Sequence, residues 1–346
     1  MASDSQIVFF HYPFSPFSAR VLYYLALRGI PYDQCIQPKI LPRPDLTRLG
    51  IRYRRIPLLS IGRDIYLDSP LILRTLEKIE GANPPFASQT TPAQRGIEGL
   101  LSKFTMETSL FRNVVQILLP STPLMHDEAF MKDRMDMMGG GSGGSAAAAD
   151  FAKFVLAGRA DAIVSVKNAF EFLETTLLAD GREWLAGTER PGLADVEMIW
   201  PIHWLLSVPG ALPEEHISAG LFPKVFAWVE RFQKAVEEAK KGVRQPESLS
   251  GDQVAEMLQQ AVADGSGDVI DEKDPLVKEK GLKKGQMVQV WPSDSGSRHK
   301  TVGRLLGLTA KETTIETVEG DISVRVHAPR QGFQVAEVSA EKANLS

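Results

Sequence analysis

The sequence contains very little cysteine, with Cys35 the only one among 346 residues. A single thiol cannot build a disulfide framework or a cysteine-based zinc site, and its rarity fits a reducing, intracellular setting. Residues 1–6 are polar and lack the apolar core of a signal peptide. No apolar run reaches the length that crosses a bilayer. These absences predict a cytoplasmic protein with no membrane partner.

An excess of charge of one sign is missing as well. The formal net charge is −4, and residues 271–346 hold 12 Lys and Arg against 11 Asp and Glu. Because nucleic-acid binding requires a basic surface, we predict no nucleic-acid partner. The six histidines show no ligand spacing, which predicts no metal site, and the Gly-rich loops that bind nucleotide phosphates are absent from the sequence.

The chain is long enough for two or three domains, and 43% hydrophobic residues can supply large cores. Residues 1–84 follow the order β-α-β, then β-β-α, with runs of strand formers and amphipathic helices. The predicted strands are 7–11, 31–37, 57–61 and 65–67, and the predicted helices are 17–28 and 68–80. Cys35 falls within the second strand, where a small core residue is more typical than a nucleophile.

Residues 92–241 have the apolar period of an all-α domain. Helices are predicted around 97–110, 151–178, 194–206 and 221–240. A flexible Gly/Ser loop at 139–149 interrupts them, and its composition is that of a disordered linker. The loop is either natural low complexity or an engineered replacement, and we assign it no function.

The last part of the chain changes from a helical to an alternating pattern. Residues 242–274 are polar and predict a linker, with one short helix at 252–262. Residues 275–346 predict a small β-barrel, similar to an SH3 domain, because short strands alternate with turn residues. Its strands are expected at 287–291, 301–306, 313–318, 322–327 and 332–338. Trp291, His327 and Arg330 either mark a groove on this barrel or support its packing.

Ser15-Pro16-Phe17-Ser18 lies between the first predicted strand and the first predicted helix. A hydroxyl at this place is close to the positive end of the helix dipole. A serine cannot form a mixed disulfide, but Ser15 can donate a hydrogen bond to a bound thiolate and lower the pKa of the thiol. The alternative is that Ser15 is an ordinary N-cap.

Two further motifs flank the predicted hairpin: Ile56-Pro57 precedes it, and Asp68-Ser69 follows it. A cis Pro57 would turn the backbone of Ile56 outward, where it can pair with an extended peptide; the alternative is a trans proline that opens an edge strand. Asp68-Ser69 begins a helix, whose free backbone N–H groups can bind a carboxylate, while Asp68 can meet an ammonium group. The alternative is plain helix capping.

In this order and spacing, the three motifs resemble the N-terminal domain of glutathione S-transferases over residues 7–81, and the resemblance extends more loosely to 241. It implies an α+β protein, with a thioredoxin-like glutathione-binding domain at 1–84 and an all-α domain at 92–241. Glutathione is the implied cofactor. The activating hydroxyl would be Ser15, with Tyr12 as the second candidate. The residues implied to hold glutathione are Ile56 and Pro57 for its cysteinyl backbone, Asp68 and Ser69 for its γ-glutamyl end, and Lys39 and Arg55 for its glycyl carboxylate.

The same resemblance gives expectations for the helical domain. Gly192-Leu193-Ala194-Asp195 corresponds to a capping box of the family, with Gly192 in place of the usual Ser or Thr, so that Asp195 is structural. The acceptor substrate would bind near Phe14, Phe104, Thr108 and Phe111. A cluster of methionines either lines the same pocket or forms a plain helix face: Met131, Met135, Met137 and Met138.

The whole layout is similar to a fungal subgroup of glutathione transferase-like proteins with an added C-terminal region. It implies a transferase in which the glutathione thiolate attacks a small, apolar electrophile, in the tailoring of natural products. An alternative is a glutathione-dependent C=C isomerase. A second alternative is a non-catalytic scaffold or interaction protein, for which the intact set of three motifs has no use. Family members are commonly dimers, and the added region leaves a homodimer or a monomer open.

Overall fold

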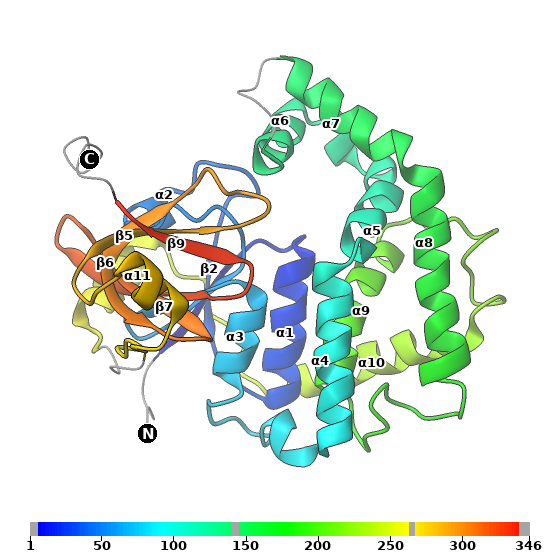
Figure 1. Cartoon of the computed structure of the whole chain (residues 1–346). Helices are drawn as coiled ribbons and strands as arrows, with labels where there is room; N and C mark the ends of the chain where they lie inside the picture. The colour runs from blue at the N-terminus through cyan, green and yellow to red at the C-terminus, as the bar shows by residue number, and fades with distance from the viewer. Residues whose placement is uncertain (1–5, 140–144, 263–266, 339–346) are drawn as a thin grey trace.

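A computed structural model describes residues 6–139, 145–262 and 267–338 of the chain (Figure 1). The predicted Gly/Ser loop falls partly outside this range, because residues 140–144 are not described, and a helix already begins at Ser145. Within the described range, every helix is too short or too polar to cross a membrane.

The N-terminal part has the predicted order β-α-β, then β-β-α, with one additional short helix between the second and third strands. Its elements are β1 (Ile7–His11), α1 (Pro16–Arg28), β2 (Asp33–Ile36), α2 (Pro44–Thr47), β3 (Leu58–Ile61), β4 (Asp64–Leu67) and α3 (Ser69–Leu76). Strand β1 pairs in parallel with β2 and antiparallel with β3, and β3 and β4 form the predicted hairpin. This arrangement confirms the thioredoxin-like domain. Gly29 ends α1 with a φ of 62°, a conformation in which glycine avoids the steric cost of a side chain.

The helical part confirms the predicted all-α domain. Its α-helices are α4 (Pro92–Glu107), α5 (Leu110–Leu118), α6 (Glu128–Met137), α7 (Ser145–Ala157), α8 (Arg159–Phe172), α9 (Leu193–Leu206) and α10 (Pro223–Lys241). The short turn η1 (Phe86–Gln89) precedes α4, and η2 (Leu119–Ser121) and η3 (Pro123–His126) lie between α5 and α6. A π-helical turn, η4 (Leu173–Leu177), follows α8 directly. The single helix predicted at 151–178 is wrong. It breaks at Gly158, which separates α7 from α8; a Cβ atom there would lie 2.2 Å from Nε2 of Gln116, so the Gln116 side chain would have to move.

Asp195 has the structural role that the sequence predicted for it. Its carboxylate accepts hydrogen bonds from the backbone N–H of Gly192 and of Leu185, both at 2.9 Å, and from Nε1 of Trp228 at 2.8 Å. Burial raises the pKa of Asp195 to about 6, although these hydrogen bonds favour the charged form. The carboxylate therefore fixes the start of α9 against α10.

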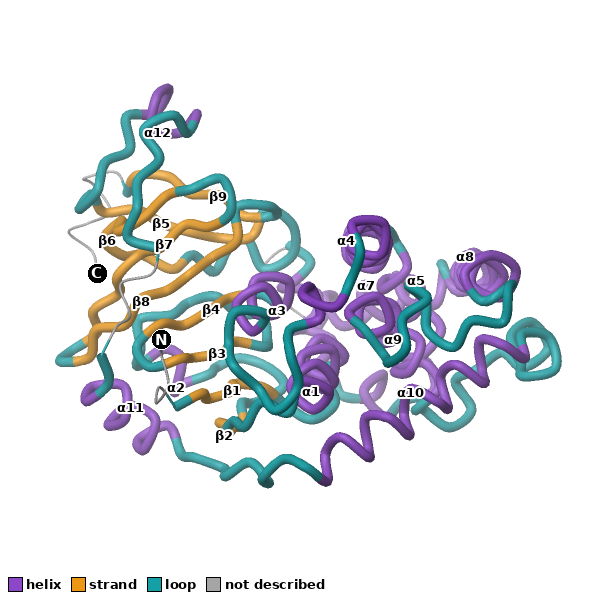
Figure 2. The backbone as a smooth tube through the Cα atoms, turned by 90° about the horizontal axis from the view of Figure 1, so that it is seen from below, coloured by secondary structure: helices purple, strands orange, loops and turns teal. Residues whose placement is uncertain are grey.

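The C-terminal part contains α11 (Gly251–Gln260), α12 (Pro275–Lys280), β5 (Met287–Pro292), β6 (Thr301–Leu308), β7 (Glu312–Glu319), β8 (Ile322–Pro329) and β9 (Phe333–Glu337). The five predicted strands are thus present. They extend the N-terminal sheet, because β8 pairs in parallel with β4, and the strand order is β2-β1-β3-β4-β8-β7-β6-β5-β9 (Figure 2). The pairing of the described strands does not close, so the predicted barrel is not confirmed.

Successive side chains of each strand point to opposite faces of the sheet, so the buried residues form two cores. Phe9 of β1 faces a core that also contains residues of α1, α3 and the helical part. Its neighbours Val8 and Phe10 face a second core, shared with α11 and the C-terminal strands. Figure 2 shows this layering, with α1 and α3 on one side of the strands and the segment after α10 running along the sheet to α11. The site described next lies beside the first core.

Candidate active site

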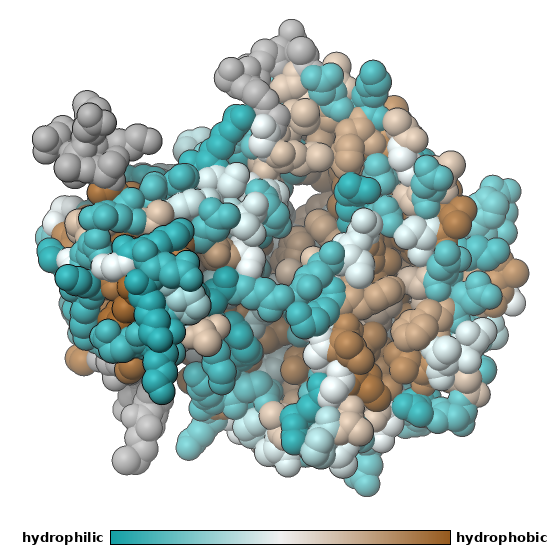
Figure 3. Space-filling view, in the orientation of Figure 1, coloured by the Kyte–Doolittle hydropathy of each residue, from teal (hydrophilic) through white to brown (hydrophobic). Residues whose placement is uncertain are grey.

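A cavity of about 950 Å³ lies where the three parts of the chain meet. Its walls come from the loop after β1, the segment 53–57 before β3, helices α5 and α6, and the loop after β5. Its volume is within the range of small-molecule sites. In the space-filling view, hydrophobic surface lines the hollow below α6 and α7 (Figure 3).

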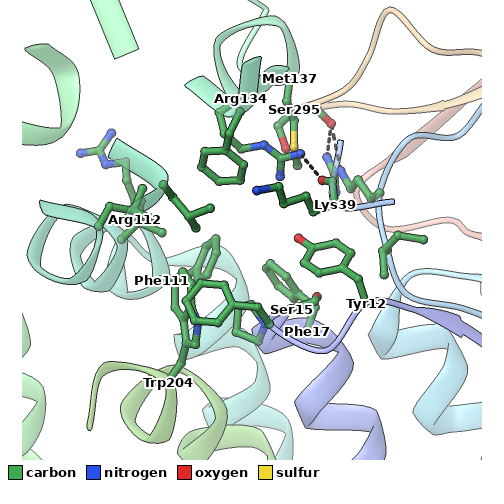
Figure 4. Close-up of a pocket in the computed structure, with 18 of the residues that line it drawn as sticks. Tyr12, Ser15, Phe17, Lys39, Phe111, Arg112, Arg134, Met137, Trp204 and Ser295 are labelled. Carbon is green, nitrogen blue, oxygen red and sulfur yellow. Dashed lines mark hydrogen bonds between the residues drawn. The ribbon is translucent and has the colours of Figure 1, made fainter. Parts of the chain in front are cut away.

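Ser15 is both an N-cap and a residue of this cavity. Its Oγ accepts a hydrogen bond from the backbone N–H of Ser18 at 3.3 Å, which fixes the first turn of α1. Because a hydroxyl can accept and donate at once, this bond leaves the hydroxyl hydrogen of Ser15 for a ligand. The two interpretations of Ser15 from the sequence are therefore compatible. Figure 4 shows Ser15 and Tyr12 on the floor of the same cavity.

The Ile56–Pro57 peptide bond is cis, as the resemblance implied, and both residues line the cavity. Asp68 lines it as well and caps α3 through a hydrogen bond of 2.9 Å from the backbone N–H of Ser69. Asp68 has a φ of 68°, which Asp tolerates better than most residues. Burial raises the pKa of its carboxyl, against the nearby charge of Arg55.

Arg55, which the resemblance assigned to the glycyl carboxylate, instead lies beside Asp68, at the predicted γ-glutamyl end of the site. Nη1 of Arg55 is 3.9 Å from the Asp68 carboxylate. Its Nε donates to the backbone carbonyl of Ser295 at 2.9 Å, and Nη2 pairs with the carboxylate of Asp294. The loop after β5, in the C-terminal part, thus fixes the side chain of Arg55, which belongs to the N-terminal part.

Ser69 is fully buried and is not among the residues that line the cavity. Its hydroxyl accepts a hydrogen bond of 3.0 Å from the buried side chain of Arg20. Arg20 also donates to Ser102 at 3.2 Å and forms an ion pair with Glu197 of α9. In this structure the Ser69 side chain therefore helps to join α1, α3 and the helical part.

Lys39 reaches the cavity from the loop after β2, as Figure 4 shows. Its Nζ is 2.9 Å from the Asp127 carboxylate, and it lies over the ring of Phe130 at 5.9 Å from the centroid. About half of the side chain is exposed (47%), so the ammonium group remains accessible to solvent and to a ligand.

Aromatic side chains form the wall of the cavity on the side of the helical part. Phe111 stacks on Trp204 with 5.9 Å between ring centroids, and Phe14 lies edge-on to Trp204 at 5.5 Å. Phe17 lies 4.7 Å from Phe111 and also 4.7 Å from Trp200, by the same measure. Phe14 is 41% exposed, so its ring is accessible to a ligand in the cavity.

Two of the predicted acceptor residues lie elsewhere. Phe104 packs on Phe172 of α8, with 6.2 Å between centroids, and the hydroxyl of Thr108 caps the end of α4 by donating to the carbonyl of Phe104. Neither is among the cavity-lining residues. The reason is the orientation on the helix: Thr105 and Met106 of α4 do line the cavity, whereas Phe104 faces α8 and Thr108 is the C-cap of α4.

Sequence reasoning missed several residues of the cavity. They include Arg43, Arg54, Arg112, Arg134, Trp204, Asp294 and Ser295. Arg54 connects the three parts, because it pairs with Asp133 at 2.7 Å and with Asp136 of α6, and lies 3.4 Å from Nε2 of His299. The methionine cluster was the only sequence signal for α6, and Met137 and Met138 do line the cavity.

No group of metal ligands occurs among the described residues. Cys35 is buried, and burial raises the pKa of its thiol to about 12, so that it stays protonated. The side chains that line the cavity include hydroxyls, cationic groups, aromatic rings and the carboxylates of Asp68 and Asp294.

Comparison with known families adds to this geometry. Residues 9–84 match the family model described as the glutathione S-transferase N-terminal domain. The N-terminal domain is thus glutathione S-transferase-like. Residues 113–241 match a second family model, described as a domain of unknown function (DUF7962).

Solved structures extend the likeness over the whole fold. A GST-like protein from Pseudomonas syringae shares 21% identity and a TM-score of 0.66, covering 97% of this chain and all of its own. The β-etherase LigF from Sphingobium sp. strain SYK-6 shares 14% identity and a TM-score of 0.50, covering 68% of this chain and 99% of its own. A search of curated protein sequences gave no match. The resemblance to a fungal subgroup stays a prediction.

Proposed function

We propose that this protein is a glutathione transferase-type enzyme that activates the glutathione thiol for attack on an apolar, aromatic electrophile. The observation that carries the proposal is that Ser15, the cis Ile56–Pro57 pair and Asp68 line one cavity with an aromatic wall. The match of residues 9–84 to the glutathione S-transferase N-terminal domain supports glutathione as the thiol.

The residues of the N-terminal part fit glutathione by their chemistry. Ile56 lines the cavity directly before a cis proline, where a peptide ligand can pair with its backbone. Asp68 supplies an anion for the α-ammonium group, with Arg55 beside it for the α-carboxylate. Lys39 supplies a cation for the glycyl carboxylate. Ser69 contributes through the Arg20 contact that fixes the start of α3.

Bound glutathione supplies a thiol whose sulfur becomes the nucleophile. The Ser15 hydroxyl donates a hydrogen bond to the thiolate, and the N-terminus of α1 adds a favourable dipole. Both effects favour the charged form, so they lower the pKa of the thiol from about 8.5. Tyr12 is the second hydroxyl of the cavity and the second candidate for this role.

The acceptor would lie against Phe14, Phe111 and Trp204. Flat aromatic rings stack on such side chains at centroid distances of about 4.5–7 Å. In the transfer step a carbon–sulfur bond forms, and the electron pair leaves with the displaced group or, in an addition, takes up a proton. Isomerisation begins with the same attack and ends with loss of the thiolate, so it stays an alternative. The non-catalytic alternative gives no reason for an open cavity with these three motifs.

The test is a calorimetric titration of glutathione into the wild type and into Asp68→Asn. Asn keeps the cap of α3 and tolerates the same backbone conformation, but it lacks the charge for an ammonium group. The matched control is Asp321→Asn, at the exposed turn between β7 and β8. We expect binding to the wild type and to the control, and a clear loss in Asp68→Asn. Absence of binding to the wild type would overturn the proposal.

A further inference from the structure

The loop between β5 and β6 brings the C-terminal part into the cavity. Asp294 and Ser295 of this loop line the cavity, and Figure 4 shows Ser295 at its rim, on the same side as Lys39. The loop is anchored on two sides, because Gly296 N–H donates to the carbonyl of Met137 in α6 at 2.6 Å, and Ser293 N–H donates to Gly332 at 2.9 Å. Both family models end before this loop, at residues 84 and 241.

Gly296 shows how closely the loop approaches the N-terminal part. Its φ is +78°, and a Cβ atom there would lie 3.0 Å from Cγ of Arg54. Glycine is therefore required both by the backbone conformation and by the contact. This contact sets the loop beside the segment 54–57, where Arg55 precedes the cis Ile56–Pro57 pair.

The loop holds the guanidinium of Arg55 along one edge. The Ser295 carbonyl accepts from Nε at 2.9 Å, and the Asp294 carboxylate pairs with Nη2. Nη1 lies toward Asp68, at 3.9 Å, which is longer than a hydrogen bond. The Arg55 side chain is only 16% exposed, whereas Asp294 is 67% exposed. Arg55 is thus a nearly buried cation between two carboxylates, with one edge directed to the proposed γ-glutamyl end.

We propose that Asp294 and Ser295 are positioning residues for thiol binding: they orient Arg55 so that its Nη1 edge and Asp68 together bind the zwitterionic α-amino-acid end of glutathione. The carboxylate of that end would pair with Arg55 and its ammonium with Asp68. This inference rests on the proposed function, and it makes the C-terminal part a component of the glutathione site.

The experiment measures glutathione affinity by calorimetry in the full-length wild type, Asp294→Ala, Arg55→Ala and the double variant. A partly exposed pair predicts a modest effect. We expect about a fivefold loss of affinity in Asp294→Ala, which converts to about 1 kcal/mol. The KM for the acceptor should not change. In the Arg55→Ala background the Asp294 substitution should cause no further loss, because Asp294 acts through Arg55. Asp294→Glu should restore part of the affinity.

A glutathione analogue without the α-amine gives a second measurement. Wild type should discriminate against it, and Asp294→Ala should discriminate less, an effect that a merely structural role would not produce.

The matched control is Asp321→Ala, which removes the same charge from the same part of the chain, away from the cavity. Asp294→Asn replaces Asp294→Ala if the latter does not fold. Wild-type binding with an unchanged Asp294 variant, or an additive double variant, would overturn this inference alone. Absence of wild-type binding would overturn the proposed function with it.

Discussion

Nε2 of His327 lies 2.7 Å from Oδ1 of Asp64, across the parallel β4–β8 pair that joins the C-terminal strands to the N-terminal sheet. The imidazole is fully buried and stacks on Tyr66 with 4.5 Å between centroids. Its Nδ1 lies 3.7 Å from the Glu312 carboxylate. Burial alone would lower the pKa of His327, but the bonds to Asp64 and Glu312 outweigh it and raise the pKa above 6.5.

This pair predicts how stability depends on pH. A raised pKa in the folded state means that His327 contributes stability fully below about pH 6.5, its unfolded value, and that the contribution disappears as pH rises through the folded pKa. Each unit of difference is worth about 1.4 kcal/mol. We expect the thermal midpoint of the wild type to fall over this window, and Asp64→Asn to flatten the dependence. His216→Gln, at an exposed histidine, is the control. An unchanged slope in Asp64→Asn would contradict this role of the pair.

The buried pair of Arg20 and Glu197 predicts a large stability effect. Glu197→Gln leaves the fully buried Arg20 without its counter-ion, and removing one partner of such a pair costs about 3–5 kcal/mol. Chemical unfolding should show this loss. Replacing both partners by Met and Leu should recover much of it, because the uncompensated charge is then absent. Glu230→Gln, in an exposed pair with Lys234, should change little. A small effect of Glu197→Gln would show that water reaches Arg20.

The Ser15→Ala variant and its companions test the catalytic role of the hydroxyl separately from its role as the N-cap of α1. We expect kcat/KM to fall about 10- to 100-fold, the range of a hydrogen bond to a charged group, and the apparent pKa of bound thiol to rise toward about 8.5. The lost N-cap also lowers stability by about 1 kcal/mol. Ser15→Asn keeps the cap without the hydroxyl, and Ser15→Thr keeps both. Tyr12→Phe should have little effect on the pH–rate profile. If Tyr12→Phe shifts the profile and Ser15→Ala does not, the two roles are exchanged.

Phe111 and Phe104 form a matched pair for the acceptor wall. Phe111 lines the cavity and stacks on Trp204, whereas Phe104 packs on Phe172 outside it. Phe111→Ala should raise the KM for an aromatic acceptor severalfold, since a stacking contact is worth about 0.5–1.5 kcal/mol. Its effect on the KM for glutathione should be small. Phe104→Ala should lower the unfolding midpoint and leave both KM values unchanged. Equal effects of the two variants on the acceptor KM would contradict this division.

Much of the fold was predictable because its signals are local. The strand at 7–11, the helix that starts after Ser15 and the hairpin around Gly62 each have their own period and punctuation, and the structure has them within a few residues. The long helix predicted at 151–178 was wrong because a single glycine within a helical pattern does not reveal whether the helix ends there, as it does at Gly158. The acceptor residues divided because the sequence does not say which side of a helix faces the cavity: Phe111 lines it, and Phe104 does not.

The sequence by itself determined the order of most elements and the N-terminal likeness to glutathione S-transferases, since each depends on neighbours within a few positions. It also predicted Ser15, Ile56, Pro57 and Asp68 as site residues, and all four line the cavity. Only the tertiary structure decided that β8 pairs with β4 and that the C-terminal loop holds Arg55. The sequence of an edge strand does not identify the strand that pairs with it, because backbone hydrogen bonds are the same for any sequence. Asp294 likewise has no local pattern that names Arg55, 239 positions away, so folding alone brings their charges together.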